Sequence, residues 1–378
     1  MSNKLNILYL GAFAEPGGEE EVITYLFKNT RSDLFNSYLC GPSKSKFFNK
    51  HNFNDGQILD LRMEGIFDVK SIVKLISYIK EHDIHIIHSH GSKGGLYGRV
   101  AGFLSRRKVV NIWTLHLLIE ENNYTLSKVR KKIYMLMEHI LNKFFTDYIV
   151  CVSEDLMKKQ VQKYNYKNIC TIHNGIDIEK YRNAEKEVNN ETNSYNNVIK
   201  FGFVSRLSKQ KGVPFLIEAV RRLNEMEKYK GRFKVDIVGT GDQEEILKSM
   251  VDDYNLNDVI IFHGFVSNVP EMLSNLDVVV LPSLFEGFPM IVLESMCSIT
   301  PLIASNVNGI PEVIDNNRNG FLVEPGDIDG IVKSMILYID NPQLIRVHGI
   351  EGNKLITEKF SKEKMLEKHI HLYNSLAL

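Results

Sequence analysis

Cysteine is scarce in this chain of 378 residues, and no two of its four cysteines form a CxxC pair. Neither a disulfide framework nor a cysteine zinc site is therefore expected, and free thiols indicate a reducing compartment. Runs of about 18 apolar residues, the length that spans a bilayer, are also missing. The apolar run near the N-terminus is short and lacks a cleavage-site pattern, which predicts a buried first strand and no signal peptide. The cytoplasm is the expected location.

An excess of charge of either sign is missing too, because 46 Lys and Arg residues balance 46 Asp and Glu residues. A chain without net charge has no global field that draws it to nucleic acid, so no nucleic-acid partner is expected. Hydrophobic residues make up 44% of the chain and charged residues 24%, which is an ordinary globular composition. At this length, two domains of ordinary size are expected.

Short apolar segments rich in Ile and Val alternate with longer segments of helical period. Unbroken apolar strands between helices are typical of parallel sheets that are covered on both faces. The sequence therefore predicts an α/β fold with two Rossmann-like, doubly wound domains. The predicted strands are residues 5–11, 84–88, 109–116, 148–152 and 169–172 in a first series, and 199–204, 233–238, 259–262, 278–281 and 302–304 in a second.

A polar segment, residues 183–197, separates the two series and is dominated by Asn, Glu and Lys. This composition predicts an exposed linker or loop. We place an N-terminal domain at residues 1–182 and a C-terminal domain at residues 198–360. The last segment, residues 361–378, has a helical pattern and is expected to cross back to the N-terminal domain. Two facing domains of this class would bind ligands between the carboxyl ends of their strands.

Two cations, Arg206 and Lys211, follow the first strand of the second series and precede a predicted helix. The dipole and free N–H groups of a helix N-terminus, together with charge-assisted hydrogen bonds from two cations, suit a diphosphate. The alternative is a pair of solvated loop cations, which is the commoner state of Lys and Arg. Taken alone, the segment leaves both interpretations open.

Two glutamates, Glu286 and Glu294, flank a Gly-Phe-Pro turn, and Pro289 suits the first turn of a helix. Free N–H groups of that turn could hold phosphate or sugar oxygens. Glu294 lies among apolar residues, where an ionised carboxylate needs a partner or a function, and it could accept both hydroxyl hydrogens of a ribose. By themselves the two carboxylates would also suit the acid–base pair of a glycoside hydrolase, or a helix surface.

The order and spacing of these segments resemble the retaining GT-B glycosyltransferases, in particular glycosyltransferase family 4 (glycosyl transferases group 1). Seven residues separate Glu286 from Glu294, and Ser205-Arg-Leu followed by Lys211-Gly looks like the family's diphosphate motif. The segment 262–266 looks like the loop whose backbone contacts the nucleobase, and 173–177 looks like the inter-domain motif. The resemblance covers nearly the whole chain.

The resemblance implies a retaining, metal-independent transferase that needs no cofactor and moves a sugar from a nucleoside diphosphate, with UDP expected, to an acceptor hydroxyl. It implies a nucleotide-sugar-binding C-terminal domain and an acceptor-binding N-terminal domain. A sugar or lipid-linked acceptor in bacterial cell-surface polysaccharide or glycolipid synthesis is expected. A nucleotide-sugar epimerase and a non-catalytic sugar-nucleotide binding protein stay open as alternatives.

The family pattern also assigns roles by position. In the first half, Gly17 and Gly18 would permit positive φ and close approach of the backbone to a ligand. Leu117 follows His116 where family members often carry Asp or Gly, which leaves the acceptor contacts of this loop open. The implied catalytic residues are His116, Arg206, Lys211 and Glu286, and the implied donor-binding residues are Gly17, Gly18, Ser205, Gly239, Val266, Gly287, Phe288, Met290, Ile291 and Glu294.

Two short patterns could suggest a metal. His88 and His90 alternate at the end of a predicted strand and just after it, but two ligands do not make a site. Asp327-Ile-Asp329 resembles the Asp-x-Asp of the other large glycosyltransferase fold, although Asp327 is more simply the cap of the next helix. We expect no metal, because Arg206 and Lys211 would supply the positive charge.

A predicted helix at residues 128–145 carries a marked apolar stripe. We interpret the stripe as facing the core. Four basic residues crowd the first end of this helix, and with residues 106–108 they lead to the hypothesis of contact with anionic lipid headgroups at the inner face of a membrane. The stripe consists of Val129, Ile133, Leu136, Met137, Ile140, Leu141 and Phe144.

Overall fold

The computed structural model describes residues 4–12, 17–42, 57–63, 65, 68–118, 121, 127–182 and 198–376. The chain divides into two compact units: unit 1 consists of Met1–Gly175 with Lys362–Leu378, and unit 2 of Ile176–Ser361. The division at Gly175 comes before the predicted boundary after residue 182. The predicted linker, residues 183–197, lies outside the described residues.

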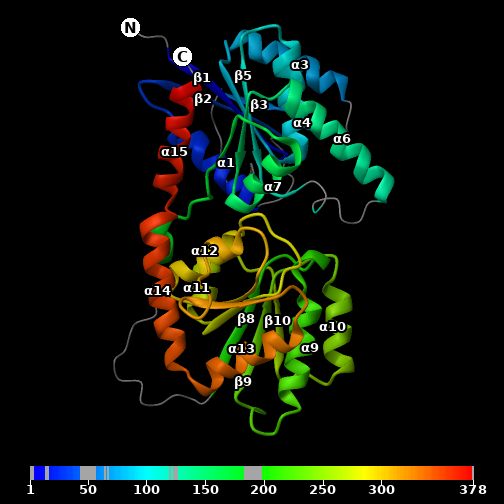
Figure 1. The fold of residues 1–378 in the computed structure, drawn as a ribbon, viewed down its shortest axis with the longest axis vertical. Coiled ribbons are helices and arrows are strands. Elements are labelled where there is room, and N and C mark those ends of the chain that lie inside the picture. Colours follow the sequence, from blue (N-terminus) through cyan, green and yellow to red (C-terminus); the bar gives the residue numbers. More distant parts are fainter. Residues whose placement is uncertain are drawn as a thin grey trace. The chain divides into compact units, whose positions relative to one another are not determined.

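Unit 1 is built on a seven-stranded parallel sheet with the order β3-β2-β1-β4-β5-β6-β7 (Figure 1). The order reverses between β1 and β4, which is the doubly wound arrangement that the sequence predicts. In register, Leu5 of β1 pairs with Phe35 on one side, and Ile7 pairs with Ile86 on the other. The strands are β1 (Leu5–Leu10), β2 (Phe35–Gly41), β3 (Ile58–Asp60), β4 (Ile86–His90), β5 (Val110–Leu115), β6 (Tyr148–Cys151) and β7 (Ile169–Thr171).

Both faces of this sheet are covered by helices, which explains why β1 is an unbroken apolar run. Ile7 and Tyr9 pack into one core with residues of α1 and α15, while Leu8 and Leu10 pack into a second core with residues of α3 and α4. The C-terminal helix α15 therefore packs on the sheet of unit 1. The helices are α1 (Gly18–Asn29), α3 (Val69–Glu81), α4 (Gly91–Leu104), α6 (Lys128–Phe144), α7 (Glu154–Tyr164) and α15 (Lys362–Leu376).

Unit 2 contains a six-stranded parallel sheet with the order β10-β9-β8-β11-β12-β13. This order reverses between β8 and β11, so the first and fourth strands of the unit are neighbours. The strands are β8 (Ile199–Val204), β9 (Phe233–Val238), β10 (Ile260–Gly264), β11 (Val278–Leu281), β12 (Leu302–Ser305) and β13 (Gly320–Val323). The helices are α8 (Ile178–Arg182), α9 (Val213–Asn224), α10 (Glu244–Asp253), α11 (Val269–Ser274), α12 (Met290–Cys297), α13 (Ile328–Asp340) and α14 (Gln343–Lys359), with short 3-10 turns at Lys209–Lys211 and Ile310–Glu312.

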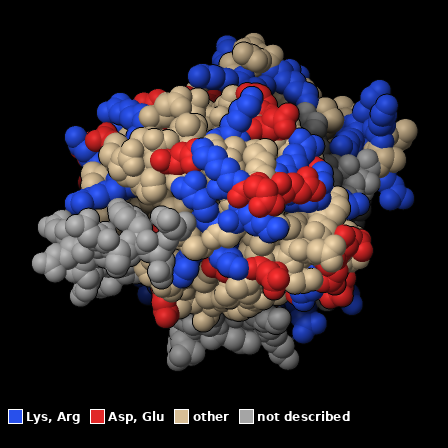
Figure 2. Space-filling model, turned by 90° about the horizontal axis from the view of Figure 1, so that it is seen from below, with Lys and Arg blue, Asp and Glu red and all other residues tan. Residues whose placement is uncertain are grey.

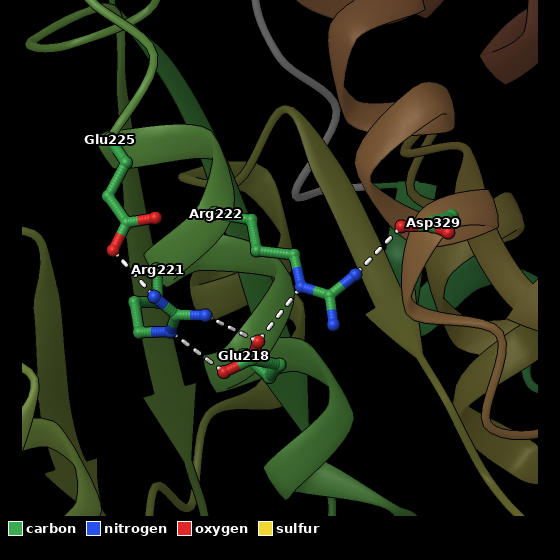
Figure 3. Close-up of polar contacts among 5 residues, drawn as sticks. All are labelled: Glu218, Arg221, Arg222, Glu225 and Asp329. Carbon is green, nitrogen blue, oxygen red and sulfur yellow. Dashed lines mark hydrogen bonds and ion pairs between the residues drawn. The ribbon is translucent and has the colours of Figure 1, made fainter.

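Charged side chains of both signs lie close together on the face drawn in Figure 2. Figure 3 shows a group of charged residues of unit 2, in which Glu218 of α9 binds both Arg221 and Arg222 at 2.8 Å. Arg222 also reaches Asp329 of α13 at 2.8 Å, so the group connects two helices. A single partly exposed pair stabilises a fold by only about 0 to 1 kcal/mol, and bidentate or networked pairs such as these are the ones that contribute most.

Helix α6 differs from the prediction, because most of its apolar stripe faces outward. Ile133 and Leu136 are each 61% exposed, and Val129, Ile140 and Phe144 are exposed as well. The buried residues of the helix are Glu138, Leu141 and Asn142. The interpretation of a core-facing stripe is therefore wrong for these five residues. No helix among the described residues is long and apolar enough to cross a membrane.

Candidate functional site

Three loops at the carboxyl edge of the unit 2 sheet lie directly against one another. The loop after β8 binds the loop after β9, with the Leu207 N–H donating to the Thr240 carbonyl at 2.9 Å. It also binds the loop after β11, where the Leu284 N–H donates to the Gln210 carbonyl at 2.8 Å. Because β8 and β11 flank the reversal of strand order, this edge is where doubly wound sheets bind ligands.

Two glycines make this close approach possible. Gly239 has a φ of +129°, and a Cβ there would lie 2.0 Å from the Ser205 carbonyl oxygen. Gly212 has a φ of +65°, and a Cβ there would lie 2.0 Å from the Pro282 carbonyl oxygen. A side chain at either position would push the loops apart, and the left-handed backbone also disfavours other residues. In this structure the lack of a side chain at Gly239 serves the contact with the β8 loop, and its predicted role in donor binding stays a prediction.

Lys211 and Glu286 form a buried ion pair at this edge. The Lys211 Nζ lies 2.6 Å from Glu286 Oε1, and the two side chains are 12% and 6% exposed. The same carboxylate oxygen accepts a hydrogen bond from Ser283 Oγ at 2.7 Å, and the Glu286 N–H donates to Asn308 Oδ1 at 3.0 Å. A buried carboxylate needs such partners because desolvation strongly disfavours an isolated charge.

Ser283 and Asn308 support Glu286 but are not among the residues that the sequence predicts. Ser283 lies three residues before Glu286 in the same loop, so the sequence alone could have indicated that the two residues are close. Asn308 comes from the loop after β12 and has a φ of +45°, a conformation that Asn tolerates better than most residues. Only the tertiary fold brings Asn308 to Glu286, since the two lie 22 positions apart.

Helix α12 begins immediately after this loop, with Pro289 at its N-cap. The first N–H groups of a helix have no carbonyl one turn earlier, so those of Met290 and Ile291 are available to ligand oxygens. Glu294 lies in the same helix and is partly buried. The predicted helix is confirmed, although it begins at Met290 and Pro289 is its N-cap, not a residue of its first turn.

The other predicted donor-binding residues of unit 2 lie along the same edge. Ser205 and Arg206 directly follow β8, and Arg206 is exposed and forms no ion pair with any residue that the structure describes. Val266 follows β10 and is partly exposed. Gly287 and Phe288 are buried in the loop before α12. The structure thus brings the predicted residues of unit 2 to the strand ends on both sides of the reversal.

In unit 1 the predicted residues also follow strands. His116 comes directly after β5, and its Nε2 lies 3.1 Å from Nδ1 of His90, the last residue of β4. Gly18 begins α1 and Gly17 is its N-cap, with a φ of −159°. This is extended backbone that any residue adopts, so the expected use of positive φ at Gly17 is wrong.

Comparisons with known proteins decide the family. Residues 184–355 match the model described as glycosyl transferases group 1, and residues 16–180 match the one described as glycosyltransferase family 4. An Escherichia coli protein, UDP-Gal:alpha-D-GlcNAc-diphosphoundecaprenol alpha-1,3-galactosyltransferase, is 31% identical over 319 residues, covering 82% of this chain and 80% of its own length. The chain belongs to glycosyltransferase family 4.

Further relatives of this glycosyltransferase agree. The capsular polysaccharide biosynthesis glycosyltransferase CapM of Staphylococcus aureus is 29% identical over 321 residues, covering 82% of this chain and 81% of its own. The crystal structure of Anabaena HepE with UDP and glucose superposes with a TM-score of 0.82 at 19% identity, covering 98% of this chain and all of that one. At this identity the likeness shows the fold, and the predicted GT-B architecture is confirmed. The comparisons support the transferase and not the epimerase or the non-catalytic alternative.

The two metal-like patterns have structural explanations in this glycosyltransferase. Asp327 Oδ1 accepts a hydrogen bond from the Gly330 N–H at 2.9 Å, so it caps α13 as predicted, and Asp329 binds Arg222 (Figure 3). His88 bonds two hydroxyls, Tyr373 through Nδ1 and Thr114 through Nε2, each at 2.7 Å. Within the described part of the chain, no three His, Cys, Asp or Glu residues form a group that could hold a metal ion.

Proposed function

We propose that this glycosyltransferase moves the sugar of a UDP-sugar to an acceptor hydroxyl and releases UDP. The transfer retains the anomeric configuration and needs no metal ion. The observation that carries the proposal is the buried Lys211–Glu286 pair at the reversal of strand order in unit 2, with the exposed Arg206 in the same loop as Lys211. An ammonium group has three N–H donors, so Lys211 can bind Glu286 and a diphosphate oxygen together. Arg206 and Lys211 would then neutralise the leaving diphosphate in place of a metal.

Glu286 suits a contact with the donor sugar better than the role of a nucleophile. Its Oε1 accepts hydrogen bonds from both Lys211 and Ser283, which hold the carboxylate in one orientation. We propose a same-face substitution in which the leaving phosphate takes the proton of the acceptor hydroxyl. Catalysis then consists of positioning and of electrostatic stabilisation of the developing diphosphate charge. The N–H groups of Met290 and Ile291 add to that stabilisation, and Glu294 would bind the ribose.

We propose that the acceptor is a lipid-linked sugar or a polysaccharide of a bacterial envelope. The support is the names of two relatives, an Escherichia coli enzyme whose acceptor is a diphosphoundecaprenol-linked sugar and a Staphylococcus aureus enzyme of capsule synthesis. Both align with more than four fifths of this chain.

The experiment incubates the protein with UDP-sugars, with polyprenyl diphosphate sugars as acceptors, and with or without EDTA. The expected result is UDP release that depends on the acceptor and is unchanged by EDTA. In the product, the NMR coupling of the new anomeric proton should match the configuration of the donor. A product of inverted configuration would refute retention, full inhibition by EDTA would refute metal independence, and conversion of the UDP-sugar without acceptor would indicate an epimerase.

We propose in addition that α6 binds an anionic membrane surface. The helix is held by its polar face: Arg99 of α4 is fully buried and lies 2.5 Å from Glu138 Oε1 and 2.6 Å from Asn142 Oδ1. The Arg99–Glu138 contact is an ion pair without hydrogen-bond geometry. Because a buried guanidinium must be paired, this contact decides which face of α6 turns inward. The apolar stripe is thereby left outside.

Basic residues accompany the exposed stripe. Lys128, Arg130 and Lys132 are exposed at the start of α6 and Lys143 near its end. Figure 1 shows α6 on the outer side of unit 1, beyond α4. An exposed apolar stripe flanked by cations is the pattern of a helix that lies in a lipid interface.

Flotation with vesicles tests this surface. The native protein should float with vesicles of phosphatidylglycerol and phosphatidylcholine and bind pure phosphatidylcholine less. Leu136→Glu should weaken binding by about tenfold or more, because burying one Leu side chain contributes about 1.5 to 3 kcal/mol. Val73→Glu is the matched control, since Val73 is 55% exposed on α3 of the same unit. Equal binding by both variants would refute the proposal. Evidence that the apolar stripe of α6 binds a second protein and not the vesicles would also refute it.

A further inference from the structure

A group of buried histidines lies beneath His116 and has no part in the function described so far. The rings of His88 and His90 of β4 are tilted against one another with centroids 4.4 Å apart, and His90 stacks with His116 at 5.4 Å. The ring of His369 of α15 lies tilted against that of His88 at 5.5 Å. His88, His90 and His369 are all buried. A neutral imidazole carries its proton on one of its two ring nitrogens. Which nitrogen is protonated depends on the hydrogen bond that the other nitrogen makes.

His88 and His369 are already committed to other partners. Both nitrogens of His88 bond hydroxyl groups, those of Tyr373 and Thr114. His369 Nδ1 donates to the Met365 carbonyl at 2.8 Å within α15. His88 and His369 therefore form no hydrogen bond with His116. The histidine that bonds His116 is His90.

The contact between His90 and His116 permits two proton arrangements. Either His90 Nδ1–H donates to a bare Nε2 of His116, or His116 Nε2–H donates to a bare Nδ1 of His90. His90 Nε2 is buried and has no hydrogen-bond partner among the residues that the structure describes. The second arrangement would leave a proton on this nitrogen without an acceptor, and orphaned buried N–H groups are rarer than under-satisfied acceptors. The first arrangement leaves it bare.

We propose that His90 is a positioning residue that holds His116 in the tautomer protonated at Nδ1. His116 is only partly buried, and its side chain forms no second hydrogen bond with any described residue. The Nδ1–H of His116 can then donate a hydrogen bond to an oxygen of the bound sugar. Its unprotonated Nε2 already accepts a hydrogen bond from His90. His116 thus binds the substrate and does not act as a general base. The sugar as ligand rests on the proposed function, but the tautomer does not.

Nitrogen NMR of protein labelled with ¹⁵N-histidine tests the tautomer directly, with the signal of His116 identified by its loss in His116→Gln. In the native protein His116 should show a protonated Nδ1 and a bare Nε2. His90→Phe keeps a ring of similar size but removes the donor, so His116 should change its tautomer. His90→Asn places an amide N–H near the lost Nδ1, so the native tautomer should return. His348→Phe is the control, because His348 is a buried histidine of unit 2 that bonds Tyr338.

Kinetics supply the second measurement. His90→Phe should lower kcat on the order of tenfold, which corresponds to about 1.4 kcal/mol, with His90→Asn restoring most of it. In a His116→Phe background, the His90 change should have no further effect. A native His116 protonated at Nε2, or one tautomer in both native protein and His90→Phe, would overturn the proposal. If no sugar is transferred at all, the proposed function fails while the NMR result still decides the tautomer.

Discussion

Replacing Lys211 by methionine removes the cation at the centre of the unit 2 site and keeps most of the side-chain volume. Glu286 then stays buried, with Ser283 as its remaining side-chain donor. Breaking a buried ion pair by removing one partner costs about 3 to 5 kcal/mol. We expect the lower end, about 3 kcal/mol, because the Ser283 hydrogen bond persists and Lys211 is not fully buried. The same change should lower kcat on the order of 10²-fold, since the leaving diphosphate loses a preorganised donor.

The double variant Lys211→Met with Glu286→Gln separates the two effects. A neutral amide at position 286 carries no uncompensated charge, so about 2 kcal/mol of the lost stability should return. The rate should not return, because the cation is still missing. Lys209→Met is the matched control, since Lys209 lies in the same short turn but is exposed. Its cost should stay within about 0.5 kcal/mol.

The assay must report on unit 2, and tryptophan fluorescence does not, because the single tryptophan, Trp113, lies in unit 1. Urea unfolding followed by far-ultraviolet circular dichroism, with hydrogen exchange of the β8 and β11 amides, gives the free energy of unfolding for this unit. If Lys211→Met costs less than about 1 kcal/mol, or if the double variant is no more stable than the single one, the account of the pair is wrong.

Three further predictions concern the ribose site, a buried histidine and a close backbone contact. Glu294→Ala should weaken UDP binding about tenfold or more, because the loss of hydrogen bonds to a charged group costs about 1.5 to 3 kcal/mol. Calorimetry measures the affinity for UDP, and an unchanged affinity would contradict the proposed contact with the ribose. Burial lowers the pKa of His369 to about 4, so its neutral form is favoured in the folded state. The unfolded chain therefore takes up the proton first, and His369 alone should cost unit 1 up to about 3 kcal/mol between pH 6.5 and pH 4, but nothing above pH 6.5. Burial also lowers the pKa of His88, His90 and His116 in the same unit, so His369→Asn should reduce this pH dependence without abolishing it, and Trp113 fluorescence in urea measures the change. Gly212→Ala should destabilise unit 2 more than Gly231→Ala, because both glycines have positive φ but only Gly212 would place a Cβ against the backbone; equal unfolding midpoints would disprove the contact.

The sequence predicts strands well where burial on both faces makes them continuously apolar. Every one of the ten predicted strands exists, and β8, β9 and β11 begin and end at the predicted residues. Strands β2, β3 and β13 were not predicted. β2 contains Asn36 and Ser37, β3 is three residues long and ends in Asp60, and β13 is four residues long and begins with Gly320, so none of the three is a continuous apolar run of strand length. A short or polar strand is recognised by its neighbours in the sheet, which a local pattern does not contain.

β4 shows a similar limit, because it extends to His90 beyond the predicted end at residue 88. His88, Ser89 and His90 are polar yet fully buried. Ser89 donates to the Ile112 carbonyl and His88 bonds Tyr373, a residue 285 positions away. Hydrogen bonds to such distant partners offset the cost of burying polar groups, and no local pattern shows them.

By itself, the sequence determined the class of fold and the edge of the C-terminal sheet at which the proposed donor-binding residues lie. Apolar periodicity specifies alternating strands and helices, and a motif at a strand end must lie at the carboxyl edge of a parallel sheet. For that reason the positions of Arg206, Lys211 and Glu286 along the chain suffice to place all three at one edge of the C-terminal sheet.

Only the tertiary structure decided which groups pair. It joined Lys211 to Glu286 and supplied Asn308 from another loop. It also turned α6 outward, because a buried Arg99 binds the polar face of that helix. In both places a buried charge must find its counter-charge, and desolvation makes this requirement stronger than the local preference of an apolar stripe for the core. Such pairings depend on distances between residues far apart in the chain, and those distances exist only once the chain has folded.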